Sequence, residues 1–423
     1  MIYNIVALII TCILSLAIAY ICVPANKYKF AFIAIAFIAV LLRIAMVFYI
    51  YRNGTDTFGT DGLLYHKEGI VIAGQLKNGV SAFGLDYSYT WYTVFIGLVY
   101  YLLGTSRYII SFINILFAIT TGMILLKIAL NHKYRFRNAA FISLSFLYFP
   151  NLALWTADTR KESLLILVCC LVWFSVQNLI ISIKQKGNML LNYLRIIFIC
   201  LLLWLSTLIR LYMFIPLMIG VITCLLIFYI KKRYAICLVF IAAVIVSALF
   251  ILVATMYPLT FDYHAVTFPK EETSSIVQDA TNKIAAVQSI ISKRNLLVSL
   301  MNYLILPYPG NIDIADIKGS WKATFFVQLD MIAWYICLIL IPSGIYAALK
   351  KRDSCFVGLL AFITTYILIN AMLVENVSDT ILRYRSVIVG LMILFIDGNV
   401  IGNFLKKLNT QVFQVIFPRK SSI

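Results

Sequence analysis

The sequence predicts an all-α polytopic membrane protein with about eleven transmembrane helices, and three observations lead to this class. Hydrophobic residues fill 63% of the 423 positions and charged residues only 12%, a balance that no soluble protein needs. Apolar runs of about one bilayer thickness recur from end to end of the chain. Basic residues gather in alternate turns between these runs, as the positive-inside rule requires of a multi-pass protein.

The first two predicted spans differ in the charges that they carry. Residues 1–23 lack a basic segment and a small-residue cleavage site, so we expect a retained span rather than a removed signal peptide. Residues 30–51 contain Arg43, and this charge should face the bundle or a polar cavity because an arginine in lipid is costly. The later predicted spans are 107–130, 138–155, 162–183, 190–208, 211–230, 234–256, 324–349, 353–374 and 383–403.

One short apolar segment sets the orientation of the whole chain. Residues 90–104 are apolar but number only about 15, fewer than a span needs. If this segment is an interfacial helix, the basic cluster from His132 to Arg137 lies inside, and the same bias then holds along the rest of the chain. The N-terminus is therefore predicted outside and the C-terminus inside. The later inner turns carry Lys184, Lys186, Lys231, Lys232, Arg233, Lys350, Lys351, Arg352, Lys406, Lys407, Arg419 and Lys420.

This topology makes the chain a single integral-membrane domain with two long outer loops. Long structured loops on one side of a helical bundle usually carry function, so the chemistry is expected on the outer face. The parts are the outer loops 52–106 and 257–323, the juxtamembrane helices 61–78 and 90–104 within the first loop, and the inner tail 404–423.

The segment from Gly54 to Gly79 is the most polar part of the first outer loop. It places Asp56 and Asp61 just beyond the end of a span, and from Asp61 onward its apolar spacing predicts a short amphipathic helix. Asp61, Tyr65 and Glu68 lie at positions i, i+4 and i+7, so they share one face. A carboxylate held at the membrane surface can act as a base or bind a cation. Asp61 is also a good helix N-cap residue, and the two roles are compatible.

Other outer turns add charges of both signs. Arginine suits phosphate because its planar guanidinium donates two parallel hydrogen bonds, while nearby carboxylates could deprotonate a hydroxyl or hold a divalent cation, Mg²⁺ or Mn²⁺. The combination fits transfer of a group from a phosphate-linked lipid carrier. Each cation taken alone fits equally well as an interfacial side chain that reaches lipid phosphates. The carboxylates are Asp56, Asp61, Glu68, Asp158 and Glu162, and the cations are Arg160, Lys161, Arg210, Arg383 and Arg385.

Several remaining features bear on other functions. The nine cysteines lie in or beside apolar runs with no metal-binding spacing. His66 and His264 are both outer but far apart, so an interfacial histidine is favoured over a zinc ligand and the metal site stays unassigned. Asp330 lies in an apolar run and suits either a proton or ion site or a place near the outer rim. The net charge of +18 is scattered between spans, which indicates anionic lipid or phosphate partners and no nucleic acid.

An ordered set of short motifs runs through most of the chain. A loop aspartate opens a short helix, an interfacial segment ends in Leu-Gly, and a span ending in Phe-Pro leads to a charged turn. A Pro-x-Pro loop and an Arg-x-Arg turn follow. The motifs are Asp61-Gly-Leu-Leu-Tyr65-His66, YYLLGTSRYIISFIN, Phe149-Pro150, Arg160-Lys161-Glu162, Pro307-Tyr-Pro309 and Asn376 to Arg385. In this order the chain resembles the GT-C class of integral-membrane glycosyltransferases, in particular the bacterial protein O-mannosyltransferase and aminoarabinose transferase group.

The resemblance implies a sugar donor linked to polyprenyl phosphate or diphosphate, a glycan or lipid acceptor, and an active site facing outward from a bacterial cytoplasmic membrane. Asp61 would match the family's loop aspartate as a base or acceptor-positioning group, with Asp56 as the second candidate. The chain departs from the family pattern, because two spans precede the loop and no adjacent acidic pair follows, so metal dependence is left open. The implied phosphate-binding residues are Arg160, Lys161, Arg210, Arg383 and Arg385, and the supporting residues are Tyr65, His66 and Glu162.

Three other functions remain open on the sequence. A polymerase that joins lipid-linked repeat units also has many spans and two large outer loops, and it differs in making a ladder of products. A transporter of lipid-linked glycans would suit Arg43 and Asp330 within spans, although the sequence has no internal repeat to support it. A structural scaffold would tolerate every charge change on the outer face.

Overall fold

The computed structural model describes residues 2–52, 61–80, 91–230, 296–306, 321–351, 353–373 and 378–396. Throughout these ranges the chain forms helices and no strand, so the all-α class is confirmed. The first helices are α1 (Ile2–Cys22), α2 (Lys29–Arg52), α3 (Asp61–Lys77), α4 (Trp91–Leu103), α5 (Arg107–Asn131), α6 (Phe136–Tyr148), α7 (Pro150–Trp155) and α8 (Glu162–Lys184). They are followed by α9 (Met189–Ile209), η2 (Leu211–Met213), α10 (Phe214–Ile230), α13 (Leu296–Ile305), α14 (Trp321–Lys351), α15 (Ser354–Leu373), α16 (Ser378–Met392) and η3 (Ile393–Phe395).

Seven of the described helices are long and apolar enough to cross a membrane, namely α1, α2, α5, α8, α9, α14 and α15. The helices α4 and α10 are apolar but shorter. By length and composition the chain is therefore a multi-pass α-helical membrane protein, while the count of about eleven spans is not confirmed. The predicted span 234–256 and the last part of 383–403 lie outside the described residues.

The predicted span 138–155 forms two helices instead of one, which corrects that prediction. The helix α6 ends at Tyr148 and α7 begins at Pro150, with Phe149 in extended backbone (φ −63°, ψ 122°) between them. Pro150 has no N–H and disfavours helical backbone in the residue before it, which accounts for the break at Phe149.

Arg43 of α2 compensates for this break from inside the bundle. Its side chain is buried, and its guanidinium donates to the carbonyl of Leu147 (Nη1–O 2.5 Å) at the end of α6 and to the hydroxyl of Thr156 (Nε–Oγ1 3.0 Å) after α7. The arginine therefore faces the bundle, as expected from the cost of its charge in lipid. Because it contacts both sides of the break, it fixes where the chain leaves α7.

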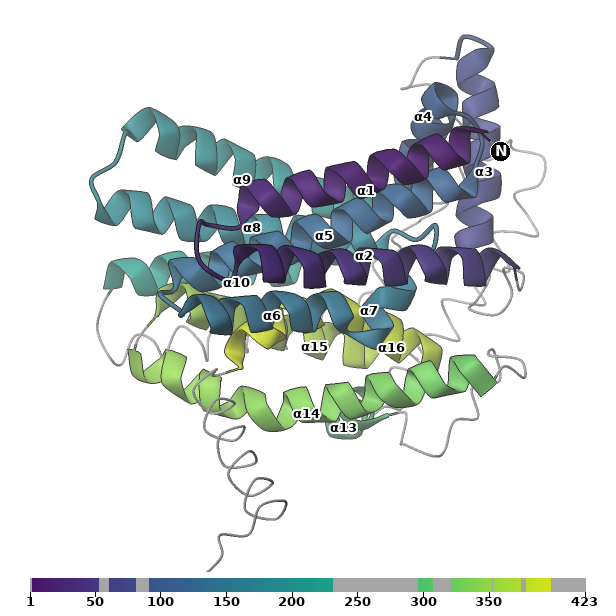
Figure 1. Ribbon diagram of the computed structural model, residues 1–423. Helices are drawn as coiled ribbons and strands as arrows, with labels where there is room; N and C mark the ends of the chain where they lie inside the picture. The colour runs from purple at the N-terminus through teal and green to yellow at the C-terminus, as the bar shows by residue number, and fades with distance from the viewer. Residues whose placement is uncertain are drawn as a thin grey trace, which may run out of the picture.

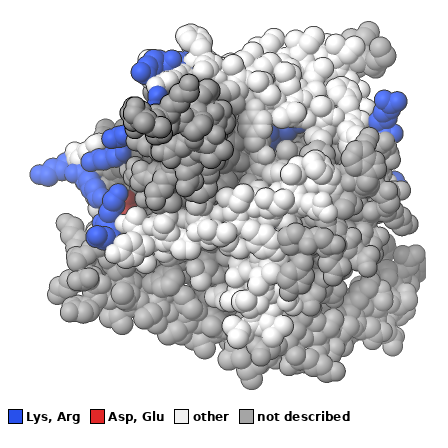
Figure 2. Space-filling view, turned by 60° about the horizontal axis from the view of Figure 1, so that its bottom comes forward, with Lys and Arg blue, Asp and Glu red and all other residues white. Residues whose placement is uncertain are grey.

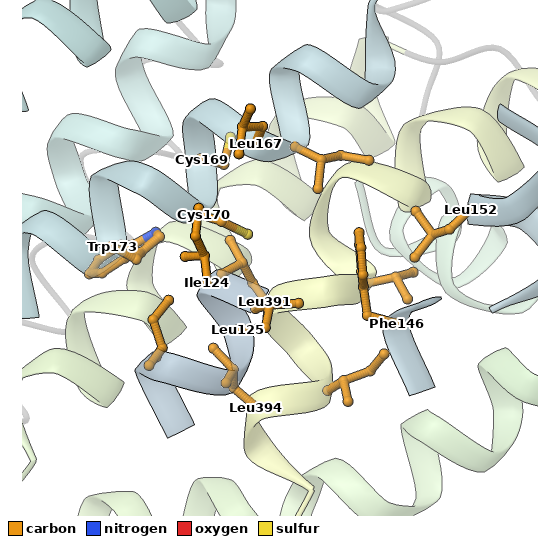
Figure 3. Close-up of a cluster of buried hydrophobic side chains, with 14 of the residues drawn as sticks. Ile124, Leu125, Phe146, Leu152, Leu167, Cys169, Cys170, Trp173, Leu391 and Leu394 are labelled. Carbon is orange, nitrogen blue, oxygen red and sulfur yellow. The ribbon is translucent and has the colours of Figure 1, made fainter. Parts of the chain in front are cut away.

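The core lies between helices that are distant in sequence. The helix α5 packs against α1, α6 and α8, and α10 packs against α15. Close packing of large side chains joins α5, α6, α7, α8 and α16 in the centre (Figure 3), where Ile124, Leu125, Phe146, Leu152, Trp173 and Leu391 are all buried. By contrast α1, α9 and α14 expose much of their apolar surface. Apolar surface of that extent indicates contact with a lipid bilayer.

The two ends of the bundle differ in structure and in charge. In Figure 1 the helix α3 stands across the bundle at the end where the N-terminus lies, with α4 beside it. Most of the visible Lys and Arg side chains gather at the opposite, left-hand end (Figure 2). Exposed basic residues of the turns at that end are Lys27, Lys133, Arg135, Arg137, Lys184, Lys186, Lys350 and Lys351. This asymmetry is the one that the positive-inside rule describes, and the assignment of the α3 end to the outside stays a prediction.

Candidate functional site

The turn between α7 and α8, residues 156–161, is held in place by hydrogen bonds from side chains of α5 and α4. The side-chain amide of Asn114 donates to the carbonyls of Asp158 (2.6 Å) and Arg160 (3.0 Å), and the hydroxyl of Tyr92 donates to the same Arg160 carbonyl (2.8 Å). Both donor side chains are fully buried. Because its carbonyls are fixed, the turn presents its side chains toward α3 in a single arrangement.

Asp158 joins this turn to the first turn of α3. Its carboxylate accepts from Arg160 (Nε–Oδ2 3.0 Å), from Arg107 (Nη2–Oδ1 3.3 Å) and from the N–H of Thr159 (2.7 Å). The hydroxyl of Thr159 in turn donates to the carbonyl of Gly62 (3.0 Å). Gly62 is required for this approach, because a Cβ at that position would lie 2.5 Å from Oδ2 of Asp158. The contact places the neighbouring Asp61 over the start of α8.

We expect Gly62→Ala to destabilise the protein by about 1–3 kcal/mol, because the added methyl overpacks a carboxylate that two arginines hold fixed. Gly74→Ala in the same helix is the matched control. A Cβ at Gly74 meets nothing within 4 Å, and alanine there should stabilise α3 by roughly 0.5–1 kcal/mol. Thermal unfolding of the detergent-purified variants compares the two, and equal melting temperatures would contradict the docking of α3 on Asp158.

Two carboxylates and two arginines meet where α3, α8, α9 and α16 converge. Arg383 of α16 forms an ion pair with Asp61 and donates through Nε to Oε1 of Glu162 (2.5 Å). Arg210, at the end of α9, donates through Nη2 to the same Glu162 oxygen (3.2 Å). Glu162 is fully buried, whereas 36% of the Asp61 side chain is exposed. The cluster therefore runs from the interior at Glu162 to the surface at Asp61.

Lys161 adds a third cation to this cluster. It is 7% exposed and lies over the ring of Tyr65 (5.9 Å to the centroid), and it forms no hydrogen bond or ion pair within the described residues. Burial, together with the nearby guanidinium of Arg210, lowers the pKa of Lys161 to about 7. With all groups ionised, three cations face the two carboxylates of Asp61 and Glu162, so the site has a surplus of positive charge.

Several buried polar atoms of the cluster lack a partner among the described residues. They are Oε2 of Glu162, Nη1 of Arg210 and the hydroxyl of Ser163, all from the start of α8 or the end of α9. Buried donors and acceptors are normally paired, so each of these atoms marks a place where a ligand or water would bind. The guanidinium donor suits an anionic oxygen and the carboxylate acceptor suits a hydroxyl.

Aromatic rings close the site on the α10 and α16 side. The guanidinium of Arg210 lies 4.2 Å from the ring centroid of Tyr384 and 5.6 Å from that of Tyr212. The Tyr212 hydroxyl donates to Asn370 of α15 (3.1 Å), which fixes its ring. Stacking on these rings holds Arg210 in one orientation, in which its buried Nη1 has no hydrogen-bond partner among the described residues.

The broken helix α6–α7 positions Arg383. The side-chain amide of Asn151, in the first turn of α7, donates to the carbonyl of Leu382 (2.6 Å), and its backbone N–H donates to Oδ1 of Asp330 (3.1 Å). Asp330 thus binds a free N–H at the start of a helix, a structural role inside the bundle. Its contact with α7 and that of Asn151 with α16 tie three helices together beside Arg383.

The structure brings together six of the residues that the sequence singled out and separates three others. The six are Asp61, Tyr65, Lys161, Glu162, Arg210 and Arg383. Arg160 pairs with Asp158, Arg385 donates to the carbonyl of Tyr303, and His66 bonds through Nδ1 to the hydroxyl of Tyr100 (2.7 Å).

Burial, followed by Arg107, lowers the pKa of His66 to about 4, so this ring is neutral at pH 7. Asp56, the second candidate base, and His264 lie outside the described residues. The roles of all these residues stay predictions.

Sequence reasoning missed the contributions of Ser163, Tyr384 and Arg107. Ser163 follows Glu162 directly, so its place at the site could have been found from the motif that contains Glu162. Tyr384 lies between the two arginines of the Arg-x-Arg pair and could have been found in the same way. Arg107 pairs with a residue 51 positions away, and no local pattern signals such a contact.

The divalent cation that the sequence left open stays a prediction at this site. Oε1 of Glu162 accepts from two arginines, and Asp61 is paired with Arg383. Within the described ranges, no three His, Cys, Asp or Glu side chains are grouped so that they could hold a metal ion. Oδ1 of Asp61 and Oε2 of Glu162 are not engaged by these arginines, but a divalent cation there would add positive charge where cations are already in excess.

No protein-family model, curated protein or solved structure matches this chain.

Proposed function

We propose that this protein is a membrane glycosyltransferase that takes its sugar from a polyprenyl-phosphate or polyprenyl-diphosphate donor at the outer face of a bacterial cytoplasmic membrane. Its products would belong to cell-envelope polysaccharide or glycolipid. One observation carries the proposal: Lys161, Arg210 and Arg383 converge beside the partly exposed carboxylate of Asp61, and Lys161 and one edge of Arg210 have no partner among the described residues. Excess cation beside an accessible carboxylate suits transfer from a phosphate leaving group.

In the proposed reaction the ammonium of Lys161 and the Nη1 of Arg210 bind donor phosphate oxygens. The bond between the sugar's anomeric carbon and the phosphate oxygen breaks, and its electron pair stays on the phosphate. These cations stabilise the charge that develops there. A new bond forms between the anomeric carbon and the acceptor oxygen, and the acceptor's proton passes to Asp61. Within the described residues Asp61 bonds only to Arg383, through Oδ2, so Oδ1 is available to the acceptor hydroxyl.

Glu162 supports this chemistry as a binding group rather than as the base. It is fully buried and holds two arginines with one oxygen, while its Oε2 accepts no hydrogen bond within the described part of the chain. A sugar hydroxyl would satisfy Oε2. The polyprenyl chain would lie in the bilayer that the exposed apolar helices contact, and the acceptor would be a glycan or lipid reaching Asp61 from the surface.

A transfer assay tests the proposal. Full-length protein in lipid nanodiscs receives radiolabelled polyprenyl-phosphate hexose and a membrane lipid extract. We expect label in a new product with the natural protein, and a loss of about a hundredfold or more with Asp61→Asn, the size typical of a positioned general base. Glu68→Gln, which removes a half-buried carboxylate from the same helix, is the matched control and should keep the natural rate.

Three outcomes would contradict the proposal. Equal rates with and without the Asp61 carboxylate would remove it as the base. A ladder of products from a lipid-diphosphate oligosaccharide, without transfer of a single hexose, would identify a polymerase instead. Movement of labelled lipid across the membrane of proteoliposomes, with neither donor consumed, would identify a transporter.

A further inference from the structure

At the end of the bundle opposite the candidate site, three helix ends border an open cavity of about 340 Å³. The last residues of α5 and α8 and the residues that open α15 form its walls. Asn131, His132, Lys133, Lys184, Ile180 and Asp353 are among its lining side chains. This cavity shares no residue with the site described above.

Hydrogen bonds between distant segments hold its polar wall. The amide of Asn131 donates to Oε1 of Gln177 on α8 (3.1 Å). His132 bonds through Nδ1 to Oδ2 of Asp353 (2.9 Å), and Oδ1 of Asp353 accepts from the N–H of Cys355 (3.0 Å). Both oxygens of Asp353 are therefore engaged, by the histidine and by the first turn of α15. Its charge is directed toward these partners rather than toward the cavity.

The two lysines of the wall supply uncompensated positive charge. Within the described residues, neither Lys133 nor Lys184 forms an ion pair. Lys133 also adopts a left-handed backbone (φ 62°), where glycine is the residue that fits without strain. With Asp353 the only acidic group in the lining, the cavity attracts anions.

The level of the cavity along the bundle identifies the kind of anion. It lies where the membrane-crossing helices α5 and α8 end, at Asn131 and Lys184, and where α15 begins, at Ser354. Ends of spans mark the depth of lipid headgroups. Toward the bundle the lining turns apolar, with Ile180 and Ile181. A ligand with a phosphate beside a glycerol and acyl chains matches this change from polar to apolar.

We infer that this cavity binds the phosphate of an anionic phospholipid headgroup, with Lys133 and Lys184 as its cationic ligands. The inference does not depend on the proposed glycosyl transfer. It differs from the general attraction of a basic surface to lipid because it assigns binding to two lysines among many. Lys186 provides the comparison: it lies two residues beyond the end of α8 and, like Lys133, has a left-handed backbone (φ 53°), yet it does not line the cavity.

Native mass spectrometry of the full-length protein in neutral detergent tests this inference. The protein is titrated with phosphatidylglycerol or phosphatidylcholine, and the lipid retained per protein is measured. We expect Lys133→Gln/Lys184→Gln to weaken phosphatidylglycerol retention about tenfold or more, since each basic residue near an anionic lipid contributes to its binding. Lys186→Gln/Lys351→Gln removes the same charge from positions at the same end that do not line the cavity, and it should change retention less than about twofold. Phosphatidylcholine retention should not differ among the three proteins.

Equal loss of phosphatidylglycerol in the two double variants would overturn the inference, because only general surface charge would then matter. Equal retention of phosphatidylglycerol and phosphatidylcholine by the natural protein would do the same. A parallel titration with inorganic phosphate separates the two sources of this anion. If millimolar phosphate alone displaces the retained lipid equally from the natural protein and from the Lys186→Gln/Lys351→Gln control, which keeps the cavity lysines, the inferred lipid occupant is wrong.

Discussion

Glu162→Gln is expected to lower the melting temperature more than any other single substitution at the site. The carboxylate is fully buried and accepts from Arg383 (2.5 Å) and Arg210 (3.2 Å), and the Arg210 side chain is only 4% exposed. A neutral amide can still accept from both arginines through its oxygen, but it leaves the two guanidinium groups without their buried counterion. Removing one partner of a buried ion pair costs about 3–5 kcal/mol.

The measurement is thermal unfolding of the purified protein in detergent, with Glu68→Gln as the control for loss of one carboxylate on the same face of the molecule. A second variant separates charge balance from packing. In Glu162→Gln/Arg210→Met the Arg210 cation is removed as well as its counterion, so one buried charge fewer is left unpaired. This double variant should recover part of the stability that Glu162→Gln loses. If Glu162→Gln melts at the natural temperature, Glu162 does not balance these arginines in the folded protein.

The sequence predicted which segments would meet more reliably than which side chains would touch. Asp61, Lys161, Arg210 and Arg383 all stand in turns that the alternation of apolar spans assigns to one end of the bundle. Topology alone therefore gathers them, whatever their local structure. The same reasoning predicted that Arg43 faces the bundle, because a charged side chain exposed to lipid is energetically costly.

Side-chain direction within those turns could not be predicted. Arg383 and Arg385 read as one Arg-x-Arg pair, but positions two apart on a helix point about 200° apart. Because α16 extends over both residues, Arg383 faces α3 and α8 while Arg385 lies against α13, where it donates to the Tyr303 carbonyl. A sequence in extended or turn conformation would have kept the two closer in direction, and the pattern of residues does not distinguish these cases.

The sequence also could not predict which of two neighbouring cations pairs with a nearby carboxylate. Arg160 and Lys161 are neighbours in one charged turn, yet Asp158 holds Arg160 two residues away while Lys161 turns toward Tyr65. Which cation a nearby carboxylate takes depends on packing of Asn114 and Tyr92 beneath the turn, and those residues come from other helices. Only the three-dimensional arrangement therefore shows that Lys161 is the cation without an ion pair among the described residues of the site.

Lys161→Met is expected to weaken donor binding by more than about tenfold while making the ligand-free protein more stable near pH 6. A charge-assisted hydrogen bond to phosphate contributes about 1.5–3 kcal/mol, and methionine removes it while keeping the length of the side chain. In the absence of donor, the lysine has no hydrogen-bonding or ion-pair partner among the described residues, so its burial in charged form is unfavourable.

The pH dependence of this stability difference follows from the lowered pKa of Lys161. Burial and Arg210 bring that pKa to about 7, against an unfolded-state value of roughly 10.4. Between these values the unfolded chain binds more protons at this residue than the native protein does, so its contribution to stability rises with pH. Below pH 7 both states are protonated and the full cost of burying the ammonium remains. The advantage of Lys161→Met should therefore be largest near pH 6 and shrink as pH rises toward 10.

Donor binding should show the opposite pH dependence, and the pair of profiles distinguishes a binding lysine from a structural one. The phosphate needs the ammonium, and its charge raises the pKa of Lys161 in the complex above the ligand-free value of about 7. Affinity of the natural protein therefore falls as pH rises from about 7 toward the pKa of the complex, because over that range the complex binds more protons than the free protein. Lys161→Met has no such fall, because it loses its only titrating group at this position. Melting curves and donor binding measured from pH 6 to 10 give both profiles. Parallel pH profiles of donor affinity in the two proteins would exclude Lys161 as a phosphate ligand, even if the stability profiles differ as expected.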